Sequence, residues 1–342
     1  MKQLTVHTST PYDVLVGSGI MQELPAQLRL RFEGARIFVV MDETVLNLHG
    51  NALVELLRIA GLTAYMHAFP AGEVHKNHET LMKVYAEMAK RELSRTDVVL
   101  AFGGGVVGDM AGFAASTYMR GLPLVMVPTT ILAMADSSIG GKTAVNLPYV
   151  KNLVGTFSQP RLVICDTDYV TTLPKREYRA GYAEVIKCAA IGDADAFSRL
   201  EHDDMSDEEA IFMALQVKAA LVEADEFDRG ERRLLNFGHT VGHAVESASG
   251  YTLRHGEAVS IGMIAITKTG EKLGITQNGT AARLTALLQS YNLPVKYDGN
   301  KQDVYKNLVY DKKTEGNMID AVLLDKIGTA VRQKLKREEL GL

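Results

Sequence analysis

The fold is decided by residues 98–109, which read VVLAFGGGVVGD. A short apolar run at residues 98–102 leads directly into three glycines, and a helical pattern follows. This order predicts a buried strand, a tight turn and a helix. Bare backbone N–H groups and a helix N-terminus would then meet at one point, where a nucleotide pyrophosphate is the natural ligand. The run does not have the GxGxxG spacing of the dinucleotide-binding motif. A close-packed turn that binds no ligand is therefore the alternative.

The same alternation of strand and helix recurs along the first half of the chain. Short apolar runs lie at residues 36–41, 64–69, 122–127 and 162–165, and helical patterns lie at 51–60 and from 77 onward. Alternating units of this kind predict a Rossmann-like α/β domain with a doubly wound parallel sheet. The ligand crevice of such a sheet lies beyond the carboxyl ends of its strands.

The pattern changes near residue 173. Strand signals almost vanish there, and helical patterns begin near residues 175, 208, 236, 256 and 279. We therefore predict two domains, an α/β nucleotide-binding domain over residues 1–172 and a mainly α-helical domain over residues 173–342. The chain length of 342 residues also favours two domains.

Composition excludes several classes of protein. The chain has 46% hydrophobic residues and a formal net charge of -4, so it has no broad positive field for nucleic acid or an anionic membrane. An anionic ligand would need a local basic cluster. Cys165 and Cys188 show no CxxC or framework spacing, and no run resembles a signal peptide or a transmembrane span. These features predict a cytoplasmic protein with buried thiols.

Two further stretches of the first domain carry polar groups. Asp42 ends an expected strand, where its carboxylate can accept hydrogen bonds from a ribose or cap a helix. Residues 136–146 read DSSIGGKTAVN, which is not a P-loop because residue 136 is Asp where the first glycine would stand. We expect a polar, glycine-rich loop there that offers hydroxyls, one carboxylate and the ammonium of Lys142.

The helical domain contains a candidate metal site. In GHTVGH at residues 238–243, His239 and His243 stand at i and i+4 on one helix face, so the pair can share a metal. His255 and Glu184 are further candidates, and three N or O ligands with one open position suit catalytic zinc. A lone histidine is more often only hydrogen-bonded, but a cluster weakens that alternative. The absence of HExxH gives a zinc protease no support.

Taken together, the motifs resemble those of the 3-dehydroquinate synthase family, within the sugar-phosphate cyclases. The resemblance spans most of the chain, and several long motifs in order are more specific than any one glycine run. It rests on Gly72-Glu73 with Lys76, GGGVVGD, RGLPLVMVPTT, DSSIGGKTAVN, KNLVGTF, TLPKREYRAGYAEVIK, GERRLLNFGHTVGHAVE, HGEA and Asp311-Lys312-Lys313.

The resemblance implies NAD as a cofactor and a divalent metal, zinc or cobalt. It places the metal on Glu184, His239 and His255, while His243 faces the substrate instead of sharing the metal with His239. The implied cofactor residues are Asp42, Glu73, Lys76, Gly104, Gly105, Val106, Asp109, Thr129, Thr130, Asp136, Ser137, Lys142, Lys151 and Thr172.

The resemblance also implies an anionic substrate, 3-deoxy-D-arabino-heptulosonate 7-phosphate. Its two charged ends would be held by Lys142, Asn152, Lys218, Arg232, Asn236, His243, Lys312 and Lys313. Arg120 resembles a family arginine that reaches the phosphate of a neighbouring subunit, which favours a homodimer.

The implied reaction is a lyase step of the shikimate pathway to aromatic amino acids. NAD oxidises the substrate transiently, phosphate is eliminated, the hydride returns, and an intramolecular aldol step closes the carbocycle. The implied catalytic residues are Lys142, Asp136, Lys187, Arg232, His243 and Asn236. Among them, Asp136 and Lys187 would orient hydroxyls, and His243 with a bound water would relay protons.

Three other functions stay open at this stage. Another sugar-phosphate cyclase shares the plan, although Lys142 is better suited to a substrate that bears a carboxylate. A polyol dehydrogenase that depends on a metal and NAD also shares it, but the set of cationic residues argues against this alternative. A non-catalytic phosphate- or metal-binding protein is the third.

Overall fold

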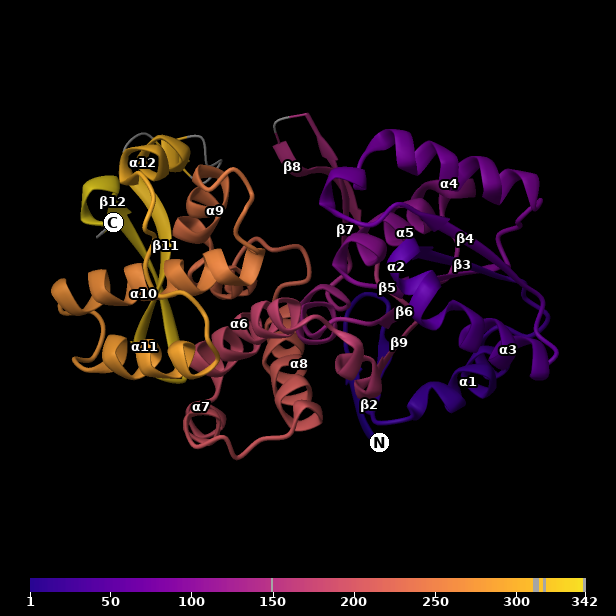
Figure 1. The fold of residues 1–342 in the computed structure, drawn as a ribbon, viewed down its shortest axis with the longest axis horizontal. Coiled ribbons are helices and arrows are strands. Elements are labelled where there is room, and N and C mark those ends of the chain that lie inside the picture. The colour runs from indigo at the N-terminus through magenta and orange to yellow at the C-terminus, as the bar shows by residue number, and fades with distance from the viewer. Residues whose placement is uncertain (149, 310–313, 316–317, 341–342) are drawn as a thin grey trace. The chain divides into compact units, whose positions relative to one another are not determined.

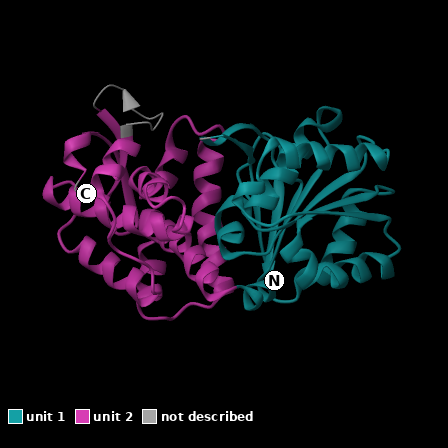
Figure 2. Cartoon of the chain, turned by 45° about the horizontal axis from the view of Figure 1, so that its top comes forward, with its two compact units in different colours: residues 1–173 teal, residues 174–342 magenta. Residues whose placement is uncertain are grey.

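The structure is a computed structural model that describes residues 1–148, 150–309, 314–315 and 318–340. It divides into two compact units, Met1–Leu173 and Pro174–Leu342, coloured separately in Figure 2. The division falls one residue beyond the boundary expected from the sequence. In the part of the chain that is described, no helix combines the length and the apolar character that a membrane crossing requires.

The first unit is built on a seven-stranded sheet with the order β1-β2-β9-β6-β5-β3-β4 (Figure 1). All neighbouring strands are parallel except β1 and β2, which are antiparallel. The strands are β1 (Lys2–Val6), β2 (Tyr12–Gly17), β3 (Ile37–Asp42), β4 (Ala64–Phe69), β5 (Val98–Gly103), β6 (Leu124–Pro128) and β9 (Leu162–Asp166). The predicted doubly wound α/β fold is therefore confirmed.

The helices of this unit alternate with the parallel strands. They are α1 (Leu24–Arg31), α2 (Glu43–Val45), α3 (Asn51–Ile59), α4 (His78–Lys90) and α5 (Gly105–Thr117). Asn77 caps α4, because its side-chain oxygen accepts a hydrogen bond of 3.0 Å from the backbone N–H of Thr80. Strands β5, β6 and β9 are buried along their whole length, as expected for a parallel sheet with both faces covered.

A hairpin corrects one prediction for this unit. The stretch at residues 136–146 was expected to be a loop, but its second half is strand β7 (Lys142–Leu147), which pairs antiparallel with β8 (Val150–Phe157). The polar and glycine-rich composition hid the strand signal. A Cβ added at Gly155 would lie 1.9 Å from the backbone oxygen of Thr143, so the hairpin requires glycine at that position.

The second unit is mainly helical, as predicted. Its helices are α6 (Lys175–Gly192), α7 (Ala194–Glu201), α8 (Asp207–Ala224), α9 (His239–Ala248), α10 (His255–Lys272), α11 (Thr280–Ser290) and α12 (Lys301–Val309). Its described residues also include a three-stranded antiparallel sheet that the sequence did not indicate, made of β10 (Thr314–Glu315), β11 (Met318–Lys326) and β12 (Thr329–Lys336). Strand β12 is mostly exposed and polar, so no apolar run marked it.

Candidate active site

The expected cofactor residues of the first unit lie at one edge of its sheet. Asp42 ends β3, Gly104 follows β5, and Thr129 follows β6. These strands are parallel neighbours, so their carboxyl ends meet at the same edge. The strand order reverses between β3 and β5, which is where open α/β sheets bind their ligands. Segments that follow the parallel strands β4 and β9 supply three more expected residues: Glu73, Lys76 and Thr172.

The glycine turn is covered by two hydroxyl side chains. Gly104 is the N-cap of α5, and Gly105 and Val106 open its first turn. A Cβ at Gly104 would lie 3.2 Å from Cγ2 of Thr130, and one at Gly105 would lie 3.1 Å from Oγ of Ser137. Backbone amides and hydroxyls therefore lie together at the N-terminus of a helix, an arrangement that suits phosphate oxygens.

Asp42 caps the short helix that follows it. Its Oδ1 accepts a hydrogen bond of 2.9 Å from the backbone N–H of Val45. The helix-cap interpretation is therefore confirmed, and a ribose contact through the same carboxylate stays a prediction.

A polar cluster joins the segment after β4 to α5 and to the hairpin. Lys76 is only 4% exposed, makes an ion pair with Asp109, and donates a hydrogen bond of 2.5 Å to Oδ1 of Asn152. The side-chain amide of Asn146 donates a hydrogen bond of 2.8 Å to Oε1 of Glu73. Three expected cofactor residues and one expected substrate residue therefore lie in one network.

The remaining expected residues of this unit lie on short turns and on the hairpin. Asp136 is half-buried in a π-helical turn, Ala133–Ser137. Lys142 opens β7 and is exposed, and Lys151 lies half-buried on β8. Arg120 is exposed and has a φ of 68°. The functional roles of these four residues stay predictions.

In the second unit, the three expected metal ligands converge. Glu184 lies on α6, His239 opens α9, and His255 opens α10. Oε1 of Glu184 lies 3.6 Å from Nε2 of His239 and 3.3 Å from Nε2 of His255. Two tetrahedral ligands with zinc bonds of about 2.0–2.2 Å stand about 3.3–3.6 Å apart. The two observed distances from Glu184 are those of ligand atoms around one zinc-like ion.

The charges at this cluster also suit a cation. Glu184 is fully buried, and neither of its oxygens accepts a well-formed hydrogen bond from the described residues, although Lys187 is ion-paired with it. Burial by itself raises the pKa of Glu184, but Lys187, His239 and His255 outweigh it and hold that pKa well below its ordinary value. Glu184 is therefore an anion with lone pairs left for a ligand.

The two imidazoles differ in their protonation. Burial lowers the pKa of His239 well below its ordinary value, which keeps that ring neutral. Burial also acts to lower the pKa of His255, but the neighbouring carboxylates of Glu184 and Glu246 raise it to about 9. Both rings present Nε2 to Glu184, and only the neutral form of an imidazole binds a metal, so a metal at His255 would displace a proton.

Close helix packing produces this convergence. A Cβ at Gly256, beside His255, would lie 1.9 Å from the backbone oxygen of Ala180 on α6. A Cβ at Gly262 would lie 2.0 Å from the backbone oxygen of Gly238, beside His239. Helix α10 therefore approaches α6 and the start of α9 at contact distances that exclude any larger side chain.

His243 lies next to the same cluster. Its ring centroid is 5.4 Å from that of His239 and 5.6 Å from that of His255. The three histidines each offer one nitrogen within 4.8 Å of the others, and His243 is the exposed member. The i, i+4 pair is therefore adjacent in space as well. A substrate-facing role for His243, with Glu184 as the third ligand, stays a prediction.

The expected catalytic residue Lys187 and three expected substrate-binding residues of this unit are buried or half-buried. Lys187 and Lys218 are 1% and 6% exposed, and Arg232 is 2% exposed and donates 2.6 Å to the backbone oxygen of Glu226. Asn236 ends the 3-10 helix Glu231–Asn236 and is half-buried. Lys312 and Lys313 lie outside the described residues.

Two residues at these clusters had no assigned role in the sequence. Asn146 bridges two expected site segments. Its side-chain oxygen accepts a hydrogen bond of 2.9 Å from the backbone N–H of Asn152, and its side-chain NH2 donates one to Glu73. Glu246 is 8% exposed, and its Oε2 lies 3.5 Å from Nδ1 of His255. Both lie inside quoted motifs, KTAVN and GHAVE, and the position of Glu246 seven residues after His239 was the available signal.

Two family models match successive parts of the chain. The model of the 3-dehydroquinate synthase N-terminal family matches residues 66–180, and the model of the C-terminal family matches residues 181–314. A curated 3-dehydroquinate synthase from Enterococcus faecalis strain OG1RF is 44% identical over 347 residues, covering 99% of this chain and 97% of the relative.

Solved structures show the same architecture over nearly the full length. The 2-epi-5-epi-valiolone synthase of Streptomyces hygroscopicus, solved with NAD⁺ and Zn²⁺ bound, is 30% identical with a TM-score of 0.88 and covers 98% of this chain and 96% of its own. A 2-deoxy-scyllo-inosose synthase is 24% identical with a TM-score of 0.91, over 99% and 98% of the two chains, and shows the fold alone. The chain belongs to the 3-dehydroquinate synthase family.

Proposed function

We propose that this chain is a 3-dehydroquinate synthase. Such an enzyme is a phosphorus-oxygen lyase that converts 3-deoxy-D-arabino-heptulosonate 7-phosphate to 3-dehydroquinate and phosphate in the shikimate pathway to aromatic amino acids. The observation that carries the proposal is the convergence of Glu184, His239 and His255, at ligand spacing, in a chain of this family. The buried thiols Cys165 and Cys188 suit a reducing cytoplasm.

A divalent metal, zinc or cobalt, fits this cluster. The buried carboxylate of Glu184 keeps two oxygens without well-formed hydrogen bonds from described residues, and a neutral imidazole stands beside it. One carboxylate and two histidines leave a coordination position for substrate oxygens, as catalytic zinc sites do. The related valiolone synthase holds Zn²⁺, which supports the same chemistry here.

NAD fits the carboxyl edge of the first unit. The turn at Gly104 and Gly105 supplies amide donors at the start of α5, and Thr130 and Ser137 supply hydroxyls beside them. The remaining proposed contacts are Asp42, Glu73, Lys76, Val106, Asp109, Thr129, Asp136, Lys142, Lys151 and Thr172.

The residues of this chain position and neutralise the substrate. NAD at the Gly104–Gly105 turn would supply reversible hydride transfer, and a metal on Glu184, His239 and His255 would supply Lewis-acid polarisation of the substrate. Asp136 and Lys187 orient the hydroxyls, and His243 moves a proton through a bound water. The buried cations hold the charged ends of the substrate more strongly than exposed ones would, because the surrounding dielectric is low. That set comprises Lys218 and Arg232, with Lys142, Asn152 and Asn236 as further contacts.

The assembly that we propose is a homodimer in which Arg120 reaches the phosphate of the partner's substrate. Arg120 is exposed, and its φ of 68° is a conformation that residues other than glycine seldom adopt. Mixing Arg120→Ala chains with chains inactivated at His239 should restore part of the activity. Mixtures as inactive as their parents would place the arginine at its own subunit's site.

The decisive assay supplies the heptulosonate phosphate, catalytic NAD and zinc, and follows free phosphate together with a carbocyclic product. A 3-dehydroquinate synthase releases phosphate without accumulating NADH, because the hydride is returned. Stoichiometric NADH without phosphate would identify a polyol dehydrogenase. Phosphate release from glucose 6-phosphate but not from the heptulosonate would identify another cyclase, and intact ligand binding without turnover would identify a binding protein.

A further inference from the structure

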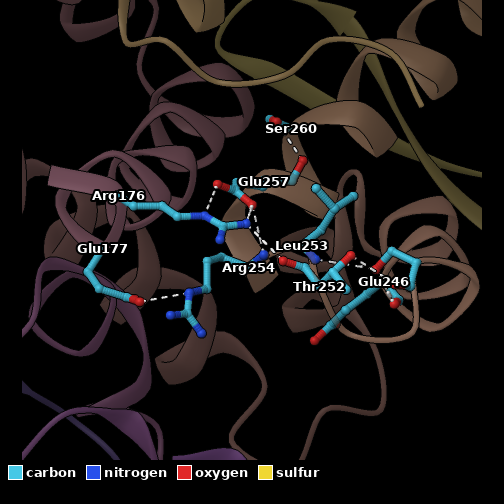
Figure 3. Close-up of polar contacts among 9 residues, drawn as sticks. Arg176, Glu177, Glu246, Thr252, Leu253, Arg254, Glu257 and Ser260 are labelled. Carbon is cyan, nitrogen blue, oxygen red and sulfur yellow. Dashed lines mark hydrogen bonds and ion pairs between the residues drawn. The ribbon is translucent and has the colours of Figure 1, made fainter. Parts of the chain in front are cut away.

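Ion pairs of Arg176 and Arg254 tie the start of α10, which begins at His255, to the start of α6; the paired side chains are drawn in Figure 3. The guanidinium of Arg176 donates two hydrogen bonds of 2.7 Å to the two carboxylate oxygens of Glu257. The N–H of Arg254 donates 2.8 Å to Glu257, and its side chain pairs with Glu177 at 2.8 Å. These contacts determine the position of the His255 backbone, but they do not determine the side-chain torsion angles that orient its ring.

The imidazole itself is flanked by two carboxylates. Its Nε2 faces Oε1 of Glu184 at 3.3 Å, and its Nδ1 lies 3.5 Å from Oε2 of Glu246. Glu246 is 8% exposed and lies on α9, two helical turns after His239. The helix that supplies one histidine of the cluster therefore also supplies a buried carboxylate to the other histidine.

The ring of His239 has a matching arrangement. Its Nδ1 lies 3.1 Å from the backbone oxygen of Phe237, so Nδ1 carries the hydrogen and Nε2 keeps its lone pair for a ligand. A carboxylate at Nδ1 of His255 selects the same tautomer. We infer that Glu246 is the positioning residue that orients His255, so that Nε2 of His255 can bind the metal beside Glu184. This inference rests on the metal site of the proposed function.

The main chain of Glu246 supports that position. Its backbone oxygen accepts a hydrogen bond of 3.1 Å from the N–H of Tyr251 and one of 2.7 Å from Oγ of Ser249. Both donors lie in the segment that leads from α9 to His255. The carboxylate is therefore anchored to the segment whose histidine it orients. A charged acceptor also makes the imidazole a stronger donor to a metal than a neutral acceptor does.

The test compares Glu246→Ala and Glu246→Gln by competition with a chelator for Co²⁺ and Zn²⁺, without NAD or substrate. Glu246→Ala should weaken metal affinity about 10- to 100-fold, the usual effect of removing such a partner. Glu246→Gln keeps an oxygen acceptor and loses the charge, so its loss should be smaller. The visible absorption of the Co²⁺ protein should change in both, which a merely structural role would not produce.

The matched control is Glu201→Gln, which removes one carboxylate of the same unit, paired with Arg283, and should bind metal as the parent does. Circular dichroism checks that each variant folds. If Glu246→Ala does not fold, the metal affinity and spectrum of Glu246→Gln alone test the inference. Parental affinity and spectrum in both Glu246 variants would overturn the inference alone, provided that His255→Ala loses the metal. If His255→Ala also keeps parental affinity, the proposed metal site is wrong and the inference fails with it.

Discussion

The two units build their candidate sites in different ways. In the first unit, the expected residues follow the ends of parallel strands that are neighbours in one sheet, and glycine amides lie there beside hydroxyl side chains. In the second unit, two buried side chains and the half-buried His255 come from α6, α9 and α10, whose backbones lie in contact at glycines. A site made of strand ends depends on topology, whereas a site made of helix faces depends on packing at single positions.

The largest expected effect is the loss of a converging imidazole. His239→Ala removes one Nε2 from the cluster, so metal binding should fail and kcat/KM should drop on the order of 10³-fold, comparable to the loss of one strong electrostatic stabiliser. Steady-state kinetics and metal analysis measure both. His202→Ala, on an exposed histidine of the same unit, is the control. Normal metal content in His239→Ala would reject the cluster as the metal site.

The next effect tests the dependence of the second unit on packing. Gly256→Ala places a methyl group 1.9 Å from the backbone oxygen of Ala180, so α6 and α10 must separate. We expect destabilisation of about 3 kcal/mol and weaker metal binding, since overpacking in a core costs roughly that much. Urea unfolding and a metal competition assay measure the two effects. Parental stability would show that the close approach is not required.

A third change concerns the opposite edge of the first unit's sheet, where no site is proposed. Asp97 pairs with Arg36 at 2.7 Å. Burial by itself raises the pKa of Asp97, but hydrogen bonds from Arg36 and Ser94 lower it from 3.8 to about 2. Because the folded pKa is depressed, this stabilisation is complete above pH 3.8 and is lost as the pH falls through about 2.

Asp97→Asn should therefore destabilise the protein by about 2 kcal/mol at neutral pH, and by progressively less as the pH falls below 4. Denaturant unfolding of both proteins across that range measures the difference, and NAD affinity should not change. A difference that is constant with pH would mean that the charge of Asp97 is not the stabilising feature.

The smallest effect tests the first unit's glycine turn. Gly104→Ala puts a methyl group 3.2 Å from Cγ2 of Thr130, in a backbone conformation that alanine adopts readily. Stability should change by less than about 1 kcal/mol, while NAD should bind about tenfold more weakly, because the methyl group occupies space beside the amides. Calorimetric titration measures the affinity. Unchanged NAD affinity would mean that the cofactor does not bind at this turn.

Much of the first unit could be predicted because its signals are local. The run at residues 98–109 gave a strand, a turn and a helix, and the turn's neighbours Thr129 and Thr130 follow the adjacent strand. Strand β7 could not be predicted from composition, because its register depends on Gly155 of β8 lying against Thr143.

The second unit was less accessible from local patterns. The i, i+4 spacing found His239 and His243. His255 and Glu184 were further candidates, but no local pattern indicated that they meet at one point, and only the family resemblance assigned them to one metal with His239. Their convergence depends on contacts between helices far apart in the sequence. Glu246 was missed for the same reason, since its partner His255 lies beyond a loop.

The most direct test is anomalous diffraction from crystals loaded with Co²⁺ or Zn²⁺. We predict one strong peak within about 2.0–2.2 Å of Oε1 of Glu184 and of Nε2 of both His239 and His255. A peak that is bound by His243 in place of Glu184, or that lies away from these three side chains, would contradict the proposed centre.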